Sequence, residues 1–209
     1  MAKIKMSKKA TSIDMTAMCD VAFLLLTFFI LTATAKAPEP LPVDTPASTV
    51  DVKLPETGLV TLTVGKSEGK DKVFFGMKDR DVRLKTLELM GAKYGVTFTP
   101  AEAAQFELID EFGVPIEGLK QVIAMKSADR NKAGVQPGIP LDSLNNQLKD
   151  WIYTVRQANI ELGKDKDLDF AIKGDAKQEY PQIKKIMDIL QDQKINSFNL
   201  VTGSRGKDF

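Results

Sequence analysis

The sequence predicts an α+β protein with a single N-terminal transmembrane helix, a proline-rich linker and a small outer domain of helices packed on a mixed β-sheet. Three observations predict it. One long apolar run lies near the N-terminus, five of the ten prolines fall between residues 38 and 55, and the remaining chain mixes strand-like with helix-like hydrophobic patterns. The 209 residues leave room for one outer domain or two small ones.

The composition excludes several kinds of function. The chain has no histidine and one cysteine, which excludes serine–histidine and cysteine–histidine nucleophile sites, histidine-ligated zinc and an internal disulfide. A net charge of +1 gives no basic field for nucleic acid. Residues 165–169 resemble the start of a calcium loop, but Phe170 and Ala176 stand where that loop needs Gly and Glu. We therefore expect no enzymatic activity, no metal and no cofactor.

Residues 15–35 form the predicted transmembrane helix, and residues 1–14 form a short tail before it. Of its 21 residues, 16 are apolar or small. A rise of about 1.5 Å per residue makes the helix about 31 Å long, the thickness of a hydrocarbon core. The tail is basic because it carries four lysines against Asp14. The positive-inside rule then places the N-terminus in the cytoplasm and residues 36–209 outside it.

A cleavable signal peptide is the alternative interpretation of the same segment. The basic start, the apolar middle and Ala33-Thr34-Ala35 fit a signal with an A-x-A cleavage site, which would give a secreted protein. Asp20 argues against it, because a carboxylate inside the apolar run gives a signal peptide no advantage.

Asp20 is the candidate functional residue of the helix. A carboxylate at membrane depth costs several kcal/mol when it is charged and faces lipid, and it usually marks an ion or proton path. At about 100° per residue, Thr16, Thr27 and Thr34 fall within about 40° of Asp20, so four of the five polar residues form one stripe. The threonines either line a path or pack against other helices. One helix cannot enclose a path, so the stripe implies partner subunits.

Residues 36–57 are predicted to be an extended linker. Proline-rich segments of this kind act as spacers, which would hold the outer domain away from the membrane or let it move. The prolines that carry this prediction are Pro38, Pro40, Pro42, Pro46 and Pro55.

The outer domain is predicted to span residues 58–209. Thr99-Pro100-Ala101-Glu102 has the signature of a helix start, with an N-cap threonine, a proline in the first turn and a glutamate three residues after the cap. In chain order we expect strands at 59–64 and 73–75, a helix that ends near Gly95, helices from Thr99 to Gly113 and from 116 to 128, and a loop over 129–140.

The C-terminal third shows clearer periodicity. Asp142 is positioned to cap a helix whose apolar face includes Leu148, Trp151, Ile152 and Val155. A strand at 168–173, an amphipathic helix over 180–190 and a last strand within 196–202 complete the predicted domain. We interpret these apolar faces as core packing and find no catalytic constellation in the domain.

The helix opening resembles a family signature. Ile13-Asp14-Met15-Thr16-Ala17-Met18-Cys19-Asp20-Val21 is similar to I-N-V-T-P-L-I-D-V, which opens the transmembrane helix of ExbD/TolR-type biopolymer-transport proteins. Asp14 and Ala17 depart from it. Val52-Lys53-Leu54-Pro55 resembles the linker motif before the family's periplasmic domain, and Ile172-Lys173-Gly174-Asp175, Tyr180 and Leu200-Val201-Thr202 resemble its later landmarks. The resemblance covers residues 12–76 and about 141–203, which leaves residues 77–140 as an insertion.

The resemblance implies an inner-membrane subunit of a motor that uses the proton motive force to energise outer-membrane transport. It implies that Asp20 carries the proton and that Val52, Leu54 and Pro55 bind a partner in the linker. It also implies a homodimer of this chain inside a ring of ExbB/TolQ-like subunits, a TonB- or TolA-like transducer and a periplasmic outer domain. The alternative is a membrane-tethered periplasmic module that binds peptidoglycan or a partner protein and has no proton role.

Overall fold

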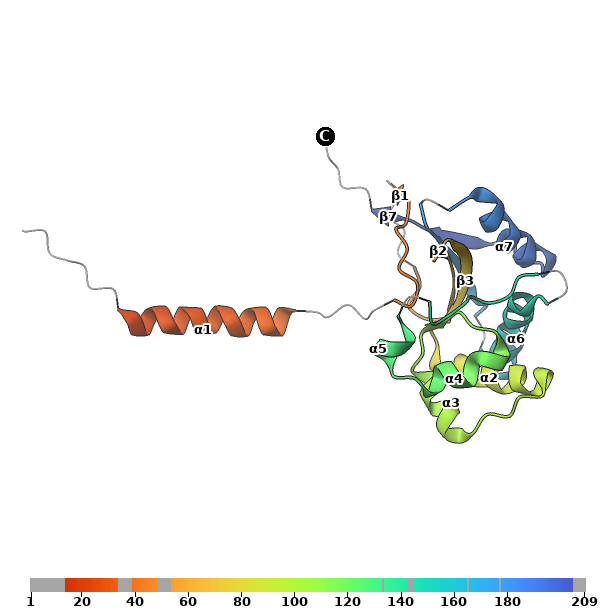
Figure 1. Cartoon of the computed structure of the whole chain (residues 1–209), viewed down its shortest axis with the longest axis horizontal. Coiled ribbons are helices and arrows are strands. Elements are labelled where there is room, and N and C mark those ends of the chain that lie inside the picture. Colours follow the sequence, from red (N-terminus) through yellow and green to blue (C-terminus); the bar gives the residue numbers. More distant parts are fainter. Residues whose placement is uncertain are drawn as a thin grey trace, which may run out of the picture. The chain divides into compact units, whose positions relative to one another are not determined.

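The computed structural model describes residues 14–33, 39–48, 54–132, 134–142, 145–164, 166–176 and 178–204. The chain divides into two units, Met1–Ala37 and Pro38–Phe209, and each is described by itself. Among the described residues, the first unit holds helix α1 (Met15–Thr32), and the second holds all strands and the other helices (Figure 1). The predicted fold class, an apolar N-terminal helix followed by helices on a mixed sheet, is confirmed.

A five-stranded sheet in the order β4-β3-β2-β5-β6 organises the outer domain. β2 pairs antiparallel with β3, and β3 with β4, whereas β2, β5 and β6 run parallel. The β2–β3 pair is the predicted hairpin, and its turn places Glu68 and Gly69 at positive φ. The strands are β2 (Leu59–Ser67), β3 (Lys70–Met77), β4 (Glu111–Phe112), β5 (Asp169–Gly174) and β6 (Phe198–Val201).

Helices α2 (Arg80–Tyr94), α6 (Gln147–Glu161) and α7 (Tyr180–Asp192) supply the apolar side chains that cover one face of the sheet. We call it the helix face. Val60, Leu62 and Val64 alternate along β2 toward this side because successive strand residues point to opposite faces. Trp151 is fully buried there, with its ring 4.9 Å from that of Phe112. Aromatic burial of this kind dominates core energetics.

The described part of residues 77–140, the predicted insertion, folds as part of the same domain. It contributes α2, α3 (Pro100–Glu107), β4, the 3-10 turn η1 (Ile116–Gly118), α4 (Leu119–Ala124) and α5 (Ser127–Arg130). Arg83 on α2 is 1% exposed and ties this region to the sheet. Its guanidinium donates to the carbonyls of Met77 and Glu107, and it lies 3.1 Å from an Asp110 carboxylate oxygen. Burial lowers the pKa of Arg83, and Asp110 opposes that shift.

Two helix predictions in the insertion differ from the structure. The helix that starts at Thr99 ends at Glu107 instead of Gly113, because Phe112 pairs with Phe75 on β3 and buries its ring in the core. Sheet pairing and burial outweigh local helix propensity there. The helix expected over 116–128 is broken into η1, α4 and α5.

The start of α6 also differs from the prediction. Asn146 caps this helix in place of Asp142, and its side chain accepts from the Lys149 amide at 3.0 Å. The buried Gln147 fixes the start, since its side-chain oxygen accepts from the Ile116 amide at 2.8 Å. Long-range bonding therefore sets this boundary, and both candidate caps are chemically suitable.

Residues 39–48 lie against the outer domain, and we call them the strap. Leu41 is 3% exposed, and the Asp44 carbonyl accepts from the Ala176 amide at 2.7 Å. The last strap residues form β1 (Ala47–Ser48), which pairs in parallel with β7 (Gly203–Ser204). This part of the predicted linker is thus fixed to the domain by burial, backbone bonding and strand pairing.

Candidate functional site

The first turn of α1 is closed by its own polar residues. Asp14 is the N-cap, and one of its carboxylate oxygens accepts from the Thr16 amide at 3.0 Å and from the Thr16 hydroxyl at 2.5 Å. Such a cap satisfies orphan amide donors at a helix start. Asp14 replaces the asparagine of the resembling signature, and it serves as an N-cap as asparagine also can.

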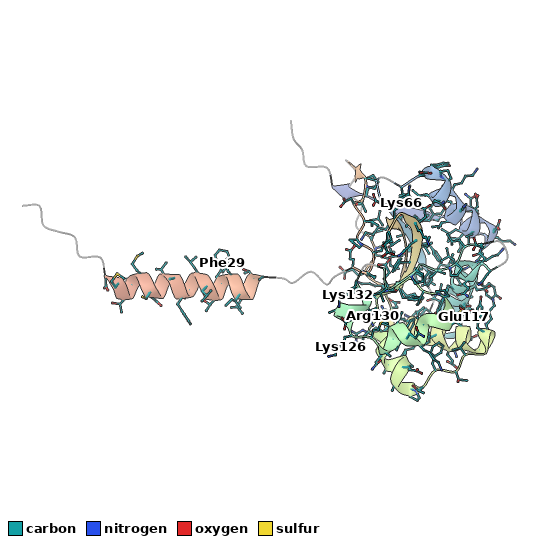
Figure 2. All side chains as sticks on the ribbon, in the orientation of Figure 1. Phe29, Lys66, Glu117, Lys126, Arg130 and Lys132 are labelled. Carbon is teal, nitrogen blue, oxygen red and sulfur yellow. The ribbon has the colours of Figure 1, made fainter. Side chains whose placement is uncertain are left out.

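Asp20 lies six residues beyond this cap, nearly two helical turns along a mostly apolar helix. Among the described residues, α1 is the one helix long and apolar enough to cross a membrane. Its side chains, Phe29 among them, stand free along its length (Figure 2). No described residue makes a hydrogen bond or ion pair with the Asp20 carboxylate. Any partner for that carboxylate must therefore come from outside the part of this chain that the structure describes.

The continuous helix places Thr16 and Thr27 on the same side as Asp20, as their spacing predicts. Both hydroxyls have acceptors within the helix, since Thr27 donates to the Leu24 carbonyl at 2.9 Å and Thr16 donates to Asp14. Neither threonine needs an outside acceptor, so packing and path lining both stay open. Thr34 lies outside the described residues, and the roles of all three stay predictions.

The linker motif is described only in part. Leu54 and Pro55 are half-buried just before β2, and Val52 lies outside the described residues. These residues belong to the outer-domain unit, and Asp20 belongs to the other unit.

Charged groups of the outer domain form local ion pairs. Lys164, for example, lies 2.7 Å from an Asp79 oxygen and 2.9 Å from an Asp81 oxygen. Burial lowers the pKa of Lys164, but its hydrogen bonds to the two carboxylates outweigh burial and raise it. Lys126, Arg130 and Lys132 lie around α5 (Figure 2). Within the described ranges, no three His, Cys, Asp or Glu residues are grouped to hold a metal ion.

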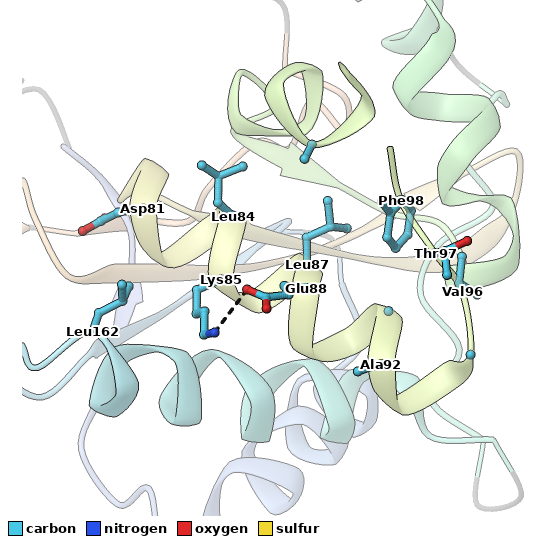
Figure 3. A pocket seen from close by; sticks show the side chains of 13 residues that line it. Asp81, Leu84, Lys85, Leu87, Glu88, Ala92, Val96, Thr97, Phe98 and Leu162 are labelled. Carbon is cyan, nitrogen blue, oxygen red and sulfur yellow. Dashed lines mark hydrogen bonds and ion pairs between the residues drawn. The ribbon is translucent and has the colours of Figure 1, made fainter. Parts of the chain in front are cut away.

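The insertion carries an apolar groove of about 800 Å³. Leu84 and Leu87 of α2 form one wall and Phe98 another, while Lys85 and Glu88 pair at 3.1 Å on the rim (Figure 3). Gly91 permits this packing, because a Cβ there would lie 2.5 Å from the Val96 carbonyl oxygen. The volume and lining are typical of a binding cleft.

The structure adds contacts that sequence reasoning missed on the second face of the sheet, opposite the helix face. We call it the strap face. Glu39 of the strap lies 2.5 Å from the Lys173 ammonium, and Leu41 is buried beside Gly65. The alternation of Glu39, Leu41 and Val43 between prolines was an available signal, since it is the pattern of a half-buried extended segment.

Comparison with known proteins gives one finding at the level of the family. The family model described as "Biopolymer transport protein ExbD/TolR" matches residues 6–204, which is nearly the whole chain and includes the insertion. No curated protein and no solved structure matches the chain.

Proposed function

Because the chain belongs to the ExbD/TolR family, we propose that it is the inner-membrane subunit of a motor that uses the proton motive force to energise outer-membrane transport. The observation that carries the proposal is Asp20, a carboxylate without a partner in the described chain, set in a helix long enough to span the membrane. In this role Asp20 takes up and releases the translocated proton.

Charge and position are coupled at such a residue. A neutral Asp20 can face apolar side chains, whereas an ionised Asp20 must face water or a polar partner. One charge that crosses 100 mV carries about 2.3 kcal/mol, so repeated cycles at one carboxylate can drive mechanical work. The proton gradient would thereby turn or shift α1 within its surroundings.

Partners follow from the exposure of α1. Every one of its side chains is exposed or, at Thr27, half-buried, so other subunits must enclose any path beside Asp20. We assign that role to a ring of ExbB/TolQ-like subunits around a homodimer of this chain. A TonB- or TolA-like transducer would receive the motion, with Val52, Leu54 and Pro55 as contact residues. The N-terminus would lie in the cytoplasm and the outer domain in the periplasm.

Replacement of Asp20 tests the proposal. Asp20→Asn keeps the size of the side chain and removes the titrating group, so energy-dependent outer-membrane uptake should be lost, while Asp20→Glu should retain part of it. Cys19→Ser is the matched control at the adjacent position and should retain uptake. Full uptake by the Asp20→Asn variant at normal protein levels would overturn the proposal.

A membrane-tethered binding module is the second candidate. The groove beside α2 favours it, because a proton carrier has no need of an apolar cleft in its outer domain. Under this function Asp20→Leu is harmless and deletion of residues 140–209 abolishes activity. Mass spectrometry of the mature protein separates both candidates from a secreted form, whose N-terminus would be Lys36.

A further inference from the structure

The strap face carries a row of polar residues that the helix face lacks. Strand register places Glu111 beside Gly76 and Thr63 beside Lys173 on this face. A Cβ at Gly76 would lie 3.5 Å from the Cβ and Cγ of Glu111, so the absent side chain leaves room for the glutamate stem. The Glu111 carboxyl thereby extends over the sheet toward the middle of the strap face.

The strap is seated on this row. The Lys173 ammonium holds a Glu39 carboxylate oxygen at 2.5 Å. Behind this ion pair, Leu41 is buried, and a Cβ at Gly65 would lie only 2.6 Å from Val43 Cγ1. The strap therefore fits closely on β2, and its ion pair with β5 is made through Lys173, an ammonium that also lowers the pKa of Glu111.

Glu111 is the carboxyl on the strap face whose hydrogen bonding is incomplete. Its Oε1 atom is fully buried and makes no hydrogen bond of good geometry, and the Thr63 hydroxyl, also buried, lies near enough to favour the ionised carboxyl. Burial raises the pKa of the Glu111 carboxyl above its usual 4.5. Thr63 and Lys173 lower that pKa, while Glu39 and Asp110 raise it. Asp110 in turn faces Arg130 of α5. Glu111 is half-buried as a residue, and its buried, unpaired oxygen favours the neutral form of the carboxyl.

We propose that the strap is a latch that Glu111 controls: the strap stays docked while Glu111 is protonated and is released when Glu111 ionises. Ionised Glu111 places a second carboxylate beside the ammonium that already holds Glu39. The two carboxylates repel each other and compete for Lys173, which weakens the ion pair of the strap. Release of the strap removes the repulsion of Glu39 and leaves Lys173 free to pair with the ionised Glu111.

The direction of the pH effect follows from the thermodynamic linkage between proton binding at Glu111 and docking of the strap. The docked state binds the proton of Glu111 more tightly than the released state does. Docking is therefore fully favoured below the ordinary pKa of a glutamate and is lost as pH rises through the higher pKa of the docked state. One proton changes the docking equilibrium by at most about tenfold per pH unit. The latch is independent of Asp20 and goes beyond the proposed function.

Distance measurement in the full chain tests the latch. In a Cys19→Ser background, Pro42→Cys on the strap and Lys184→Cys on α7 accept nitroxide labels at exposed positions. Double electron–electron resonance in detergent should give one docked distance at about pH 5 and a growing released population toward about pH 8. An identical distance distribution at both ends of that range would overturn the proposal.

Two variants test whether the pH-dependent release of the strap is due to Glu111. Glu111→Gln should keep the docked distance at every pH, and Thr63→Val should move the release to higher pH because it removes a group that favours the ionised carboxyl. Glu88→Gln on α2 is the matched control and should behave as the parent. Release by Glu111→Gln with the parent's pH dependence would refute the assignment. Fluorescence of the buried Trp151 reports folding, and Thr63→Val decides the question if Glu111→Gln does not fold.

Discussion

Asp20 of helix α1 and Arg83 of the outer domain are two charged residues in opposite settings. The domain buries Arg83 and pairs its two terminal guanidinium nitrogens with two carbonyls and a carboxylate, whereas α1 leaves Asp20 with no described partner. Buried charges are normally paired because an unpaired one is costly. The difference teaches that Arg83 finds its partners within the outer domain, while any partner of Asp20 lies outside the part of the chain that the structure describes.

Removal of the central aromatic of the domain should give the largest change in stability. Trp151→Ala leaves a cavity against Phe75 and Phe112, and such changes cost about 3–5 kcal/mol. Chemical denaturation followed by circular dichroism measures the loss. A conservative Trp151→Phe variant should lose less, and equal losses would show that ring packing is not what the position contributes.

Replacement of the buried arginine should come next. Arg83→Met keeps the aliphatic stem but leaves the carbonyls of Met77 and Glu107 without donors, at about 1–3 kcal/mol for each buried unsatisfied group. The denaturation midpoint should fall. Lys85→Met, two residues along α2 and only partly buried, is the control and should change it by no more than about 0.5 kcal/mol. An unchanged denaturation midpoint in Arg83→Met would mean that the stability of the domain does not depend on the hydrogen bonds of Arg83.

A helix cap should give a smaller effect. Thr99 and Glu102 form a reciprocal capping box at the start of α3. Thr99→Ala removes it at a cost of about 1 kcal/mol, and Thr99→Ser should restore most of that stability. The exchange of amide hydrogens in the first turn of α3 is the measurement. Unchanged exchange in the alanine variant would contradict the assigned cap.

The smallest stability change should come from Asp20, the proposed proton carrier. Asp20→Asn lies in the other unit, so the unfolding transition of the outer domain should be the same as in the parent within about 0.5 kcal/mol. The same variant should lose uptake. A domain transition that shifts with Asp20 would erase the contrast between the two regions and make the uptake result ambiguous.

The features of the fold that depend on neighbouring residues could be predicted from the sequence. Thr99, Pro100 and Glu102 predicted the start of α3. Gly95 predicted the end of α2, where it adopts the left-handed conformation that glycine tolerates. The apolar length of α1 and its one carboxylate were visible as well. These features depend on a few neighbouring residues, which is why a single sequence reveals them.

Contacts between residues far apart in the sequence could not be predicted in this way. Strands β1, β4 and β7 have two residues each, too few for any periodicity. Asp110 and Glu111 read as helix residues, and only pairing with β3 makes them part of the sheet edge. The prolines of the strap predicted an extended conformation. They did not predict that the strap packs on β2, because burial of Leu41 depends on the absence of a side chain at Gly65.

The parallel pairing of β1 with β7 has a mechanical consequence. Tension on the chain at residue 39 reaches the strap from the N-terminal end of β1, and β6 holds β7 from that strand's own N-terminal end. Parallel strands place those two ends together, so the load opens the pair like a zipper instead of shearing it. Because Glu39 and Leu41 precede β1, their contacts carry the load first, and the strap peels away one attachment at a time under a low force.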